Sequence, residues 1–196
     1  MTYSIVAVDP KTRTLGVGVA SGSIAVGSRV PWAMEGVGAI ATQAYTNIKY
    51  GVEGLRLLRA GLDPESVLSK LLSEDEGREY RQVAIIDIRN RKAVHTGSLC
   101  PKWRGEYVGE DYVIIGNYIV GPMVIESARR EMENRELGLA ERLLRALVAG
   151  ETAGGDVRGN RSAALIVVGR ERVALRVDDA RNPATILLRR FLEHRI

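Results

Sequence analysis

The start of the fold is decided by residues 2–8, which read Thr2-Tyr3-Ser4-Ile5-Val6-Ala7-Val8. The stretch alternates in polarity and is rich in β-branched side chains, which is typical of a strand. Turn-forming residues follow at 9–12, and residues 14–20 return as a second strand. The sequence therefore predicts a β-hairpin in which Gly16 and Gly18 allow another backbone to approach closely.

Outward from this hairpin, strands and helices are expected in blocks. Strands are predicted at 36–44, 80–88, 92–96, 110–120, 162–168 and 172–177, and helices at 52–60, 63–71, 124–132, 140–149 and 186–191, with a Gly-rich polar loop over 150–160. Hairpins separated by helix pairs favour a layered α+β fold over a doubly wound parallel sheet. We expect helices on both faces of stacked antiparallel sheets, in a single domain spanning residues 1–196.

Composition excludes several classes of protein. The chain has 196 residues, of which 45% are hydrophobic, and it contains one cysteine. A chain of this length buries roughly 70% of its unfolded surface, so it forms a core without metals or disulfides. Cys100 has no disulfide partner, no apolar run reaches membrane-spanning length, and Met1-Thr2-Tyr3-Ser4 does not resemble a signal peptide. We therefore expect a cytoplasmic protein that does not bind membranes.

The formal charge of +4 arises from residues 157–196, and the remainder is close to neutral. No nucleic-acid recognition motif accompanies this Arg-rich stretch, so we expect no nucleic-acid partner. No phosphate-binding loop, dinucleotide fingerprint or zinc spacing is present, so no cofactor or metal is expected. His95 and His194 are the only imidazoles. His95 lies on a predicted strand, where a histidine is more often structural than catalytic.

With few imidazoles, a hydroxyl nucleophile needs another base, and an N-terminal amine is one. Thr2 follows Met1, and threonine is small enough at that position for Met1 to be removed. The freed α-amino group, with a pKa of about 7.7 to 8, can take the Oγ1 proton near neutral pH. The alternative is that Met-Thr is merely a common way for a protein to start.

Four segments can supply the rest of a site around Thr2. Ser21 and Ser23 follow the second strand and can stabilise an oxyanion, or they form a polar turn. Asn117 can donate to the oxyanion or orient a carbonyl, or it simply closes a turn. The other candidates are substrate-binding residues at a strand end and in the Gly-rich loop: Thr42, Gln43, Asn47, Asp156, Arg158 and Ser162. Asn47 is equally suited to capping a helix, and Arg158 can bind a substrate carboxylate or pair with Asp156. Cys100, beside Pro101 and near Trp103, is interpreted as a packing residue.

Several motifs together resemble the domain of unknown function (DUF) 1028 family. They are Thr2-Tyr3-Ser4-Ile5-Val6-Ala7, Gly16-Val17-Gly18-Val19-Ala20-Ser21, Val26-Gly27-Ser28, Thr42-Gln43-Ala44-Tyr45-Thr46-Asn47, Gly77-Arg78-Glu79-Tyr80-Arg81-Gln82, Gly116-Asn117 and Gly154-Gly155-Asp156. The resemblance covers nearly the whole chain. That family is similar to the N-terminal nucleophile hydrolases, which implies a four-layer αββα sandwich of two antiparallel sheets between helix pairs. In those enzymes an N-terminal Thr, Ser or Cys attacks an amide carbonyl, and Thr2 is the corresponding position here.

The expected function is hydrolysis of an amide or related acyl bond in a small molecule or peptide, through an acyl-enzyme on Thr2. The alternative is a non-catalytic ligand-binding or assembly protein with the same fold, which retains Met1. A third possibility places the nucleophile at Ser23, Ser162 or Cys100. We also expect a homo-oligomer, with the apolar segment 30–34 as a contact.

Overall fold

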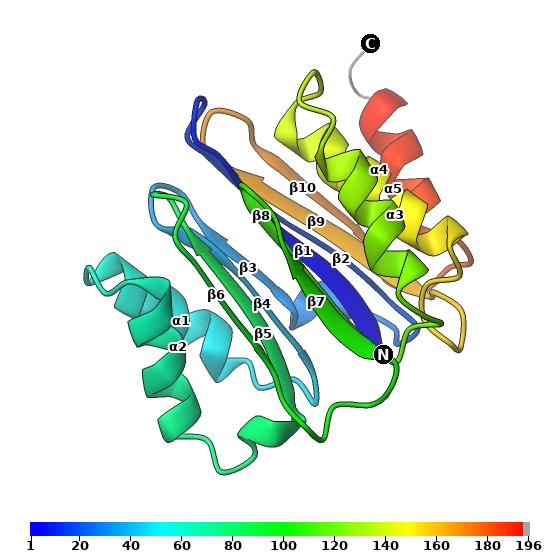
Figure 1. The fold of residues 1–196 in the computed structure, drawn as a ribbon. Helices are drawn as coiled ribbons and strands as arrows, with labels where there is room; N and C mark the ends of the chain where they lie inside the picture. The colour runs from blue at the N-terminus through cyan, green and yellow to red at the C-terminus, as the bar shows by residue number, and fades with distance from the viewer. Residues whose placement is uncertain (194–196) are drawn as a thin grey trace.

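The computed structural model describes residues 1–193, which form two antiparallel sheets and five α-helices in a mixed α+β arrangement (Figure 1). His194 lies outside the described residues. The predicted order of strands, helix pair, strands, helix pair, strands and helix is confirmed. Within residues 1–193, no helix is long and apolar enough to cross a membrane.

The larger sheet has six strands in the order β10-β9-β2-β1-β8-β7, so the hairpin of β1 and β2 lies at its centre. The register places Thr2 opposite Ser21 of β2 on one side and Asn117 of β8 on the other. The strands are β1 (Thr2–Asp9), β2 (Thr14–Ser21), β7 (Arg104–Val108), β8 (Tyr112–Asn117), β9 (Ser162–Val168) and β10 (Val173–Val177).

The smaller sheet has four strands in the order β3-β4-β5-β6. These are β3 (Pro31–Met34), β4 (Gly38–Ala44), β5 (Arg81–Asp87) and β6 (Lys92–Thr96). Helices α1 (Lys49–Arg59) and α2 (Pro64–Ser73) cover one face of this sheet (Figure 1). Helix α2 begins as expected, with Pro64 in its first turn and the Asp63 carboxylate accepting a hydrogen bond from the Ser66 amide.

The outer face of the larger sheet is covered by α3 (Met123–Met132), α4 (Leu139–Thr152) and α5 (Pro183–Glu193). Strand β1 is buried on both faces. Tyr3 and Ile5 pack in the cluster beneath these helices, whereas Val6 and Val8 pack in the cluster between the two sheets. This double burial explains why the first strand is apolar on both sides.

The two glycines of β2 explain how closely α4 packs on the sheet. A Cβ added at Gly16 would lie 2.5 Å from Leu143 Cδ1, and one at Gly18 would lie 3.2 Å from Leu147 Cδ1. The close approach was predicted, but the approaching atoms are leucine side chains of α4 instead of another backbone.

Strands β3 and β7 were not predicted, and each is an edge strand of its sheet. Strand β7 is short and largely exposed, and β3 begins with a proline, so neither carries the buried alternating pattern of a central strand. The segment 30–34, expected as an oligomer contact, includes β3. Its residues Val30 and Pro31 are buried within the chain, and a Cβ at Gly51 of α1 would lie 2.3 Å from the Trp32 ring.

Candidate functional site

A row of buried polar side chains crosses the larger sheet at the end where β1 begins. The register aligns Ser162, Ser21, Thr2 and Asn117 on four adjacent strands. Each of them is at most 6% exposed. Because side chains alternate along a strand, Thr2 shares the inner face with Val6 and Val8. The apolar core between the sheets therefore gives way to a polar end at Thr2.

The hydroxyl groups of Thr2 and Ser21 have a defined donor order. Their oxygens lie 3.0 Å apart, and Ser21 Oγ donates to the carbonyl oxygen of Met1 at 2.5 Å. A hydroxyl has only one hydrogen to donate, so Ser21 Oγ must accept from Thr2 Oγ1. The Thr2 hydroxyl proton thus points toward Ser21.

The amino group of Met1 forms an ion pair with the buried carboxylate of Asp156 and lies 3.4 Å from the carbonyl oxygen of Tyr118. Burial lowers the pKa of this amine to about 6, although the charge of Asp156 opposes the shift. This pKa belongs to the chain that retains Met1, in which the amine forms the ion pair with Asp156.

Asp156 is 1% exposed and is surrounded by donors. The Arg158 side chain donates to both carboxylate oxygens at 2.9 Å, and the Gly22 amide donates to Oδ2 at 2.9 Å. Burial acts to raise the pKa of Asp156, but hydrogen bonds from Arg158 and from the Met1 amine lower it overall to about 2. Arg158 therefore pairs with Asp156, and its guanidinium also lies over the Tyr118 ring at 5.7 Å.

Two glutamine side chains of the smaller sheet, Gln43 and Gln82, form hydrogen bonds near the start of β1. Gln43 Nε2 donates to the Thr2 carbonyl oxygen at 3.2 Å and to Gln82 Oε1 at 2.8 Å. Gln43 Oε1 accepts from the Ser4 hydroxyl at 2.5 Å. Ser4 and Gln82 were not among the sequence candidates. The alternation of β1 could have identified Ser4, because it shares the inner face with Thr2.

Asn117 presents an unpartnered acceptor. Its Nδ2 donates to Gln82 Oε1 at 3.0 Å, whereas its buried Oδ1 has no hydrogen-bond partner. The orientation of Gln82 is fixed, because its Nε2 lies 3.0 Å from the Gly116 carbonyl oxygen and 3.1 Å from that of Gly105. Exchanging the positions of Asn117 Nδ2 and Oδ1 would therefore place Asn117 Oδ1 against Gln82 Oε1, and two acceptor oxygens repel each other. In this arrangement Asn117 offers the site an acceptor instead of the predicted oxyanion donor.

The remaining candidates divide into two groups. Ser23 and Ser162 lie beside the polar row, where Ser162 Oγ donates to the Ser23 carbonyl oxygen at 2.6 Å and accepts from the Val26 amide at 3.0 Å. Thr42 and Asn47 do not join Gln43. Thr42 Oγ1 donates to the Asn47 carbonyl oxygen, and Asn47 Oδ1 accepts from the Lys49 amide, so both residues serve the start of α1.

Neither the thiol nor the described imidazole joins this cluster. The Cys100 thiol donates to the Arg81 carbonyl oxygen, and burial raises its pKa, which disfavours the nucleophilic thiolate. A ring nitrogen of His95 lies 2.9 Å from the Arg78 carbonyl oxygen. Among residues 1–193, no group of three or more His, Cys, Asp or Glu side chains is placed to hold a metal ion.

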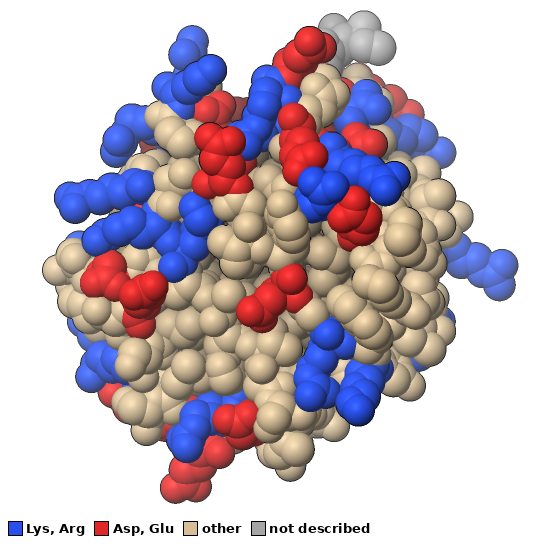
Figure 2. Space-filling view, viewed as in Figure 1, with Lys and Arg blue, Asp and Glu red and all other residues tan. Residues whose placement is uncertain are grey.

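Exposed apolar side chains surround this end of the molecule. They lie on the connections and short helical segments next to the strand ends around Thr2, or at the start of α3, and each is at least 36% exposed: Ile24, Tyr45, Ile48, Tyr80, Leu99, Trp103, Val120, Met123 and Val157. We call this set the apolar rim. Figure 2 shows charged side chains spread over one face of the molecule, with uncharged residues, polar and apolar alike, between them. Apolar surface that is gathered in one region is typical of a contact site.

Comparisons with known proteins identify a family without an assigned activity. The model described as a family of unknown function (DUF1028) matches residues 2–187. The chain is similar to the crystal structure of protein SPO2555 from Silicibacter pomeroyi, which is described with the same family model. The two share 33% sequence identity over 100% of this chain and 86% of that chain, with a TM-score of 0.92. No curated protein matches.

Proposed function

The chain belongs to the DUF1028 family, and we propose that it is an N-terminal nucleophile hydrolase that cleaves an amide or related acyl bond. The layers of helices and antiparallel sheets are assigned in this proposal to the four-layer αββα sandwich of that superfamily. The substrate is a small molecule or peptide, and the reaction needs no cofactor.

The observation that carries the proposal is the environment of the Thr2 hydroxyl. Thr2 opens the central strand, and its proton points to Ser21 in a row of buried polar groups. The amine that lies against a buried carboxylate belongs to Met1, and removal of Met1 would leave the α-amine of Thr2 one residue from that position. A nucleophile beside an amine, with the amine oriented by a third group, is the arrangement that activates a hydroxyl.

In the proposed reaction, removal of Met1 leaves the α-amine on Thr2. This amine takes the proton of Oγ1 while Oγ1 forms a bond to the substrate carbonyl carbon. It then returns the proton to the leaving nitrogen as the C–N bond breaks, and water hydrolyses the resulting ester on Thr2. Removal of Met1 also frees the Ser21 hydroxyl, which donates to the Met1 carbonyl oxygen when Met1 is present. Ser21 can then donate to the carbonyl oxygen of the substrate.

One observation favours the alternative of a non-catalytic binding or assembly protein. The amine and the carbonyl oxygen of Met1 are both bonded, to Asp156 and Ser21 respectively, so a retained Met1 fits the structure. In that state the apolar rim would contact a ligand or a second copy. Homo-oligomer formation remains a prediction.

Intact-mass measurement of protein made in cells separates the two functions. We expect the measured mass to be lower than that of the full sequence by one methionine residue. We also expect a broad acyl probe to label the protein covalently, and peptide mapping to place the label on Thr2. Retention of Met1, or labelling at Ser23, Ser162 or Cys100 instead, would contradict the proposal.

The apolar rim predicts a preference for apolar substrates. Val120→Thr preserves shape but adds a polar group at a rim position that is 53% exposed. We expect kcat/KM for an amide with a hydrocarbon acyl chain to fall by about fourfold, because roughly one methylene group loses its apolar contact. Val108→Thr is the matched control. Val108 is 51% exposed, and it lies at the end of β7 that is farther from Thr2. Equal effects of the two substitutions would exclude a role for the rim.

A further inference from the structure

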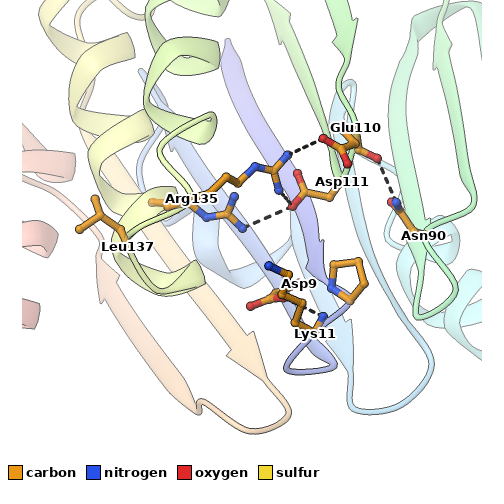
Figure 3. A pocket seen from close by; sticks show the side chains of 9 residues that line it. Asp9, Lys11, Asn90, Glu110, Asp111, Arg135 and Leu137 are labelled. Atoms are coloured by element: carbon orange, nitrogen blue, oxygen red, sulfur yellow. Dashed lines mark hydrogen bonds and ion pairs between the residues drawn. The ribbon is translucent and has the colours of Figure 1, made fainter.

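A cavity lies at the far end of β1, away from Thr2 (Figure 3). Segments that are distant in the sequence converge there: the end of β1 and the turn after it, the β5–β6 turn, the residues that precede β8, the α3–α4 connection and helix α4. Its volume is about 320 Å³. One water molecule occupies roughly 30 Å³ of liquid volume, so the cavity has room for a small organic ligand.

Two buried atoms at this cavity have no hydrogen-bond partner. Asp111 and Arg142 are each 3% exposed in their side chains, and Arg142 Nη2 lies 3.5 Å from Asp111 Oδ2. Asp111 Oδ1 and Arg142 Nε remain unpartnered. An unpartnered buried polar atom costs about 1 to 3 kcal/mol, and more when it is charged. Each of these two buried charged groups, which line the cavity, therefore keeps one hydrogen-bonding atom unsatisfied.

A second carboxylate and a second cationic group, those of Asp9 and Lys11, also line the cavity. Asp9 Oδ1 accepts from the Lys11 amide at 2.9 Å and from the Thr12 amide at 3.3 Å, and the carboxylate has no ion-pair partner among residues 1–193. The ammonium group of Lys11 also has no ion-pair partner within residues 1–193. A second acceptor and a second donor thus lie beside the buried pair.

Arg135 spans the cavity and covers the buried pair. Its guanidinium pairs with Asp111 and Glu110, as Figure 3 shows, and its side chain is 45% exposed. Moving this arginine aside would leave the buried Asp111 carboxylate short of a cation, so a ligand that displaces it must bring a positive group of its own. Movement of Arg135 would open Asp111 to a ligand.

The charges lining the cavity balance. Three are cationic and three are carboxylates: Lys11, Arg135, Arg142, Asp9, Glu110 and Asp111. A simple anion would face the carboxylates and a simple cation would face the basic groups. We propose that this cavity binds a small zwitterion, such as a free α-amino acid, with its ammonium toward Asp9 and Asp111 and its carboxylate toward Lys11 and Arg142. The pairing is by charge-assisted hydrogen bonds.

Isothermal titration calorimetry with L-alanine tests this site. We expect saturable binding with a dissociation constant below about 1 mM, and at least tenfold weaker binding of methylammonium or acetate, each of which carries half of the charge pattern. Lys11→Met and Asp9→Asn are suitable variants, because neither residue belongs to the buried pair that holds α4. Each should weaken L-alanine binding by at least about tenfold, since it removes one of the proposed ionic contacts.

Lys102→Met and Asp179→Asn change exposed charges elsewhere and should bind L-alanine as the unaltered protein does. Absence of saturable binding would overturn the proposal and leave water as the occupant. Binding that survives both cavity substitutions would also overturn it, because the amino acid would then occupy another place, such as the Thr2 site. Equally tight binding of acetate or methylammonium would exclude recognition of a zwitterion.

Discussion

Thr2→Ala is expected to abolish covalent acylation and to lower turnover of any substrate that the acyl probe identifies by a factor of about 10⁴ or more, because it removes the only atom that forms the covalent bond. The fold should persist. Thr2 Oγ1 makes one hydrogen bond, to Ser21, so the free energy of unfolding should fall by only about 1 kcal/mol. Labelling with an acyl probe and denaturant unfolding measure the two effects separately.

Two further substitutions make the Thr2 result specific. Thr2→Ser keeps a hydroxyl at the same place and should retain labelling. Thr14→Ala removes another buried threonine hydroxyl from the same sheet, at the opposite end of β2, and should leave labelling unchanged. Undiminished turnover in the Thr2→Ala protein would disprove the nucleophile assignment, whatever its stability.

The central hairpin was predictable because its strands are buried on both faces. The β-branched residues of 2–8, the turn at 9–12 and the glycines of β2 are local signals that agree with the tertiary packing. The expected alternation of polarity does not continue beyond Ser4, because both faces of β1 are buried. Edge strands carry weaker signals, because one side of an edge strand faces solvent. Strand β7, with the sequence Arg104-Gly105-Glu106-Tyr107-Val108, has no buried alternating face to detect.

The site residues that the sequence predicted correctly are those at the ends of predicted strands. Thr2, Ser21 and Asn117 each occupy the terminal residue of a strand, and antiparallel pairing brings those ends together. The side of the smaller sheet on which a residue lies was harder to assign. Gln43 points to Thr2, but its neighbour Thr42 points to α1, since adjacent strand residues face opposite sides.

Contacts between segments that are distant in sequence could not be derived from local pattern. Asp156 reaches the Met1 amine and Gly22 across more than 130 positions of the chain. The sequence showed only that Asp156 and Arg158 carry opposite charges in one loop. Their ion pair favours the reading in which Arg158 fixes the loop, and it makes Asp156 the residue that ties this loop to the start of β1.

Asp156→Asn should therefore have the largest effect on stability among the site substitutions. The pKa of Asp156 is lowered from 3.8 to about 2 in the folded protein, a difference that corresponds to about 2 kcal/mol. Because the folded state lowers this pKa, the stabilisation is fully present above about pH 4 and is lost as the pH falls through about 2. We expect the substituted protein to be less stable at pH 7 by about this amount, and the two unfolding free energies to converge on acidification.

Activity gives a second, independent measure of the same carboxylate. The charge of Asp156 raises the pKa of the adjacent amine against the effect of burial. That amine belongs to Met1, and in the proposed reaction the base is the α-amine that Thr2 gains when Met1 is removed. We expect the charge of Asp156 to act on this amine in the same direction, so Asp156→Asn should move the acid limb of kcat/KM to lower pH and lower its maximum. Asp179→Asn is the control, because Asp179 forms an exposed ion pair with Arg161 that should contribute less than about 1 kcal/mol. An unmoved acid limb would show that Asp156 stabilises the loop without positioning the base.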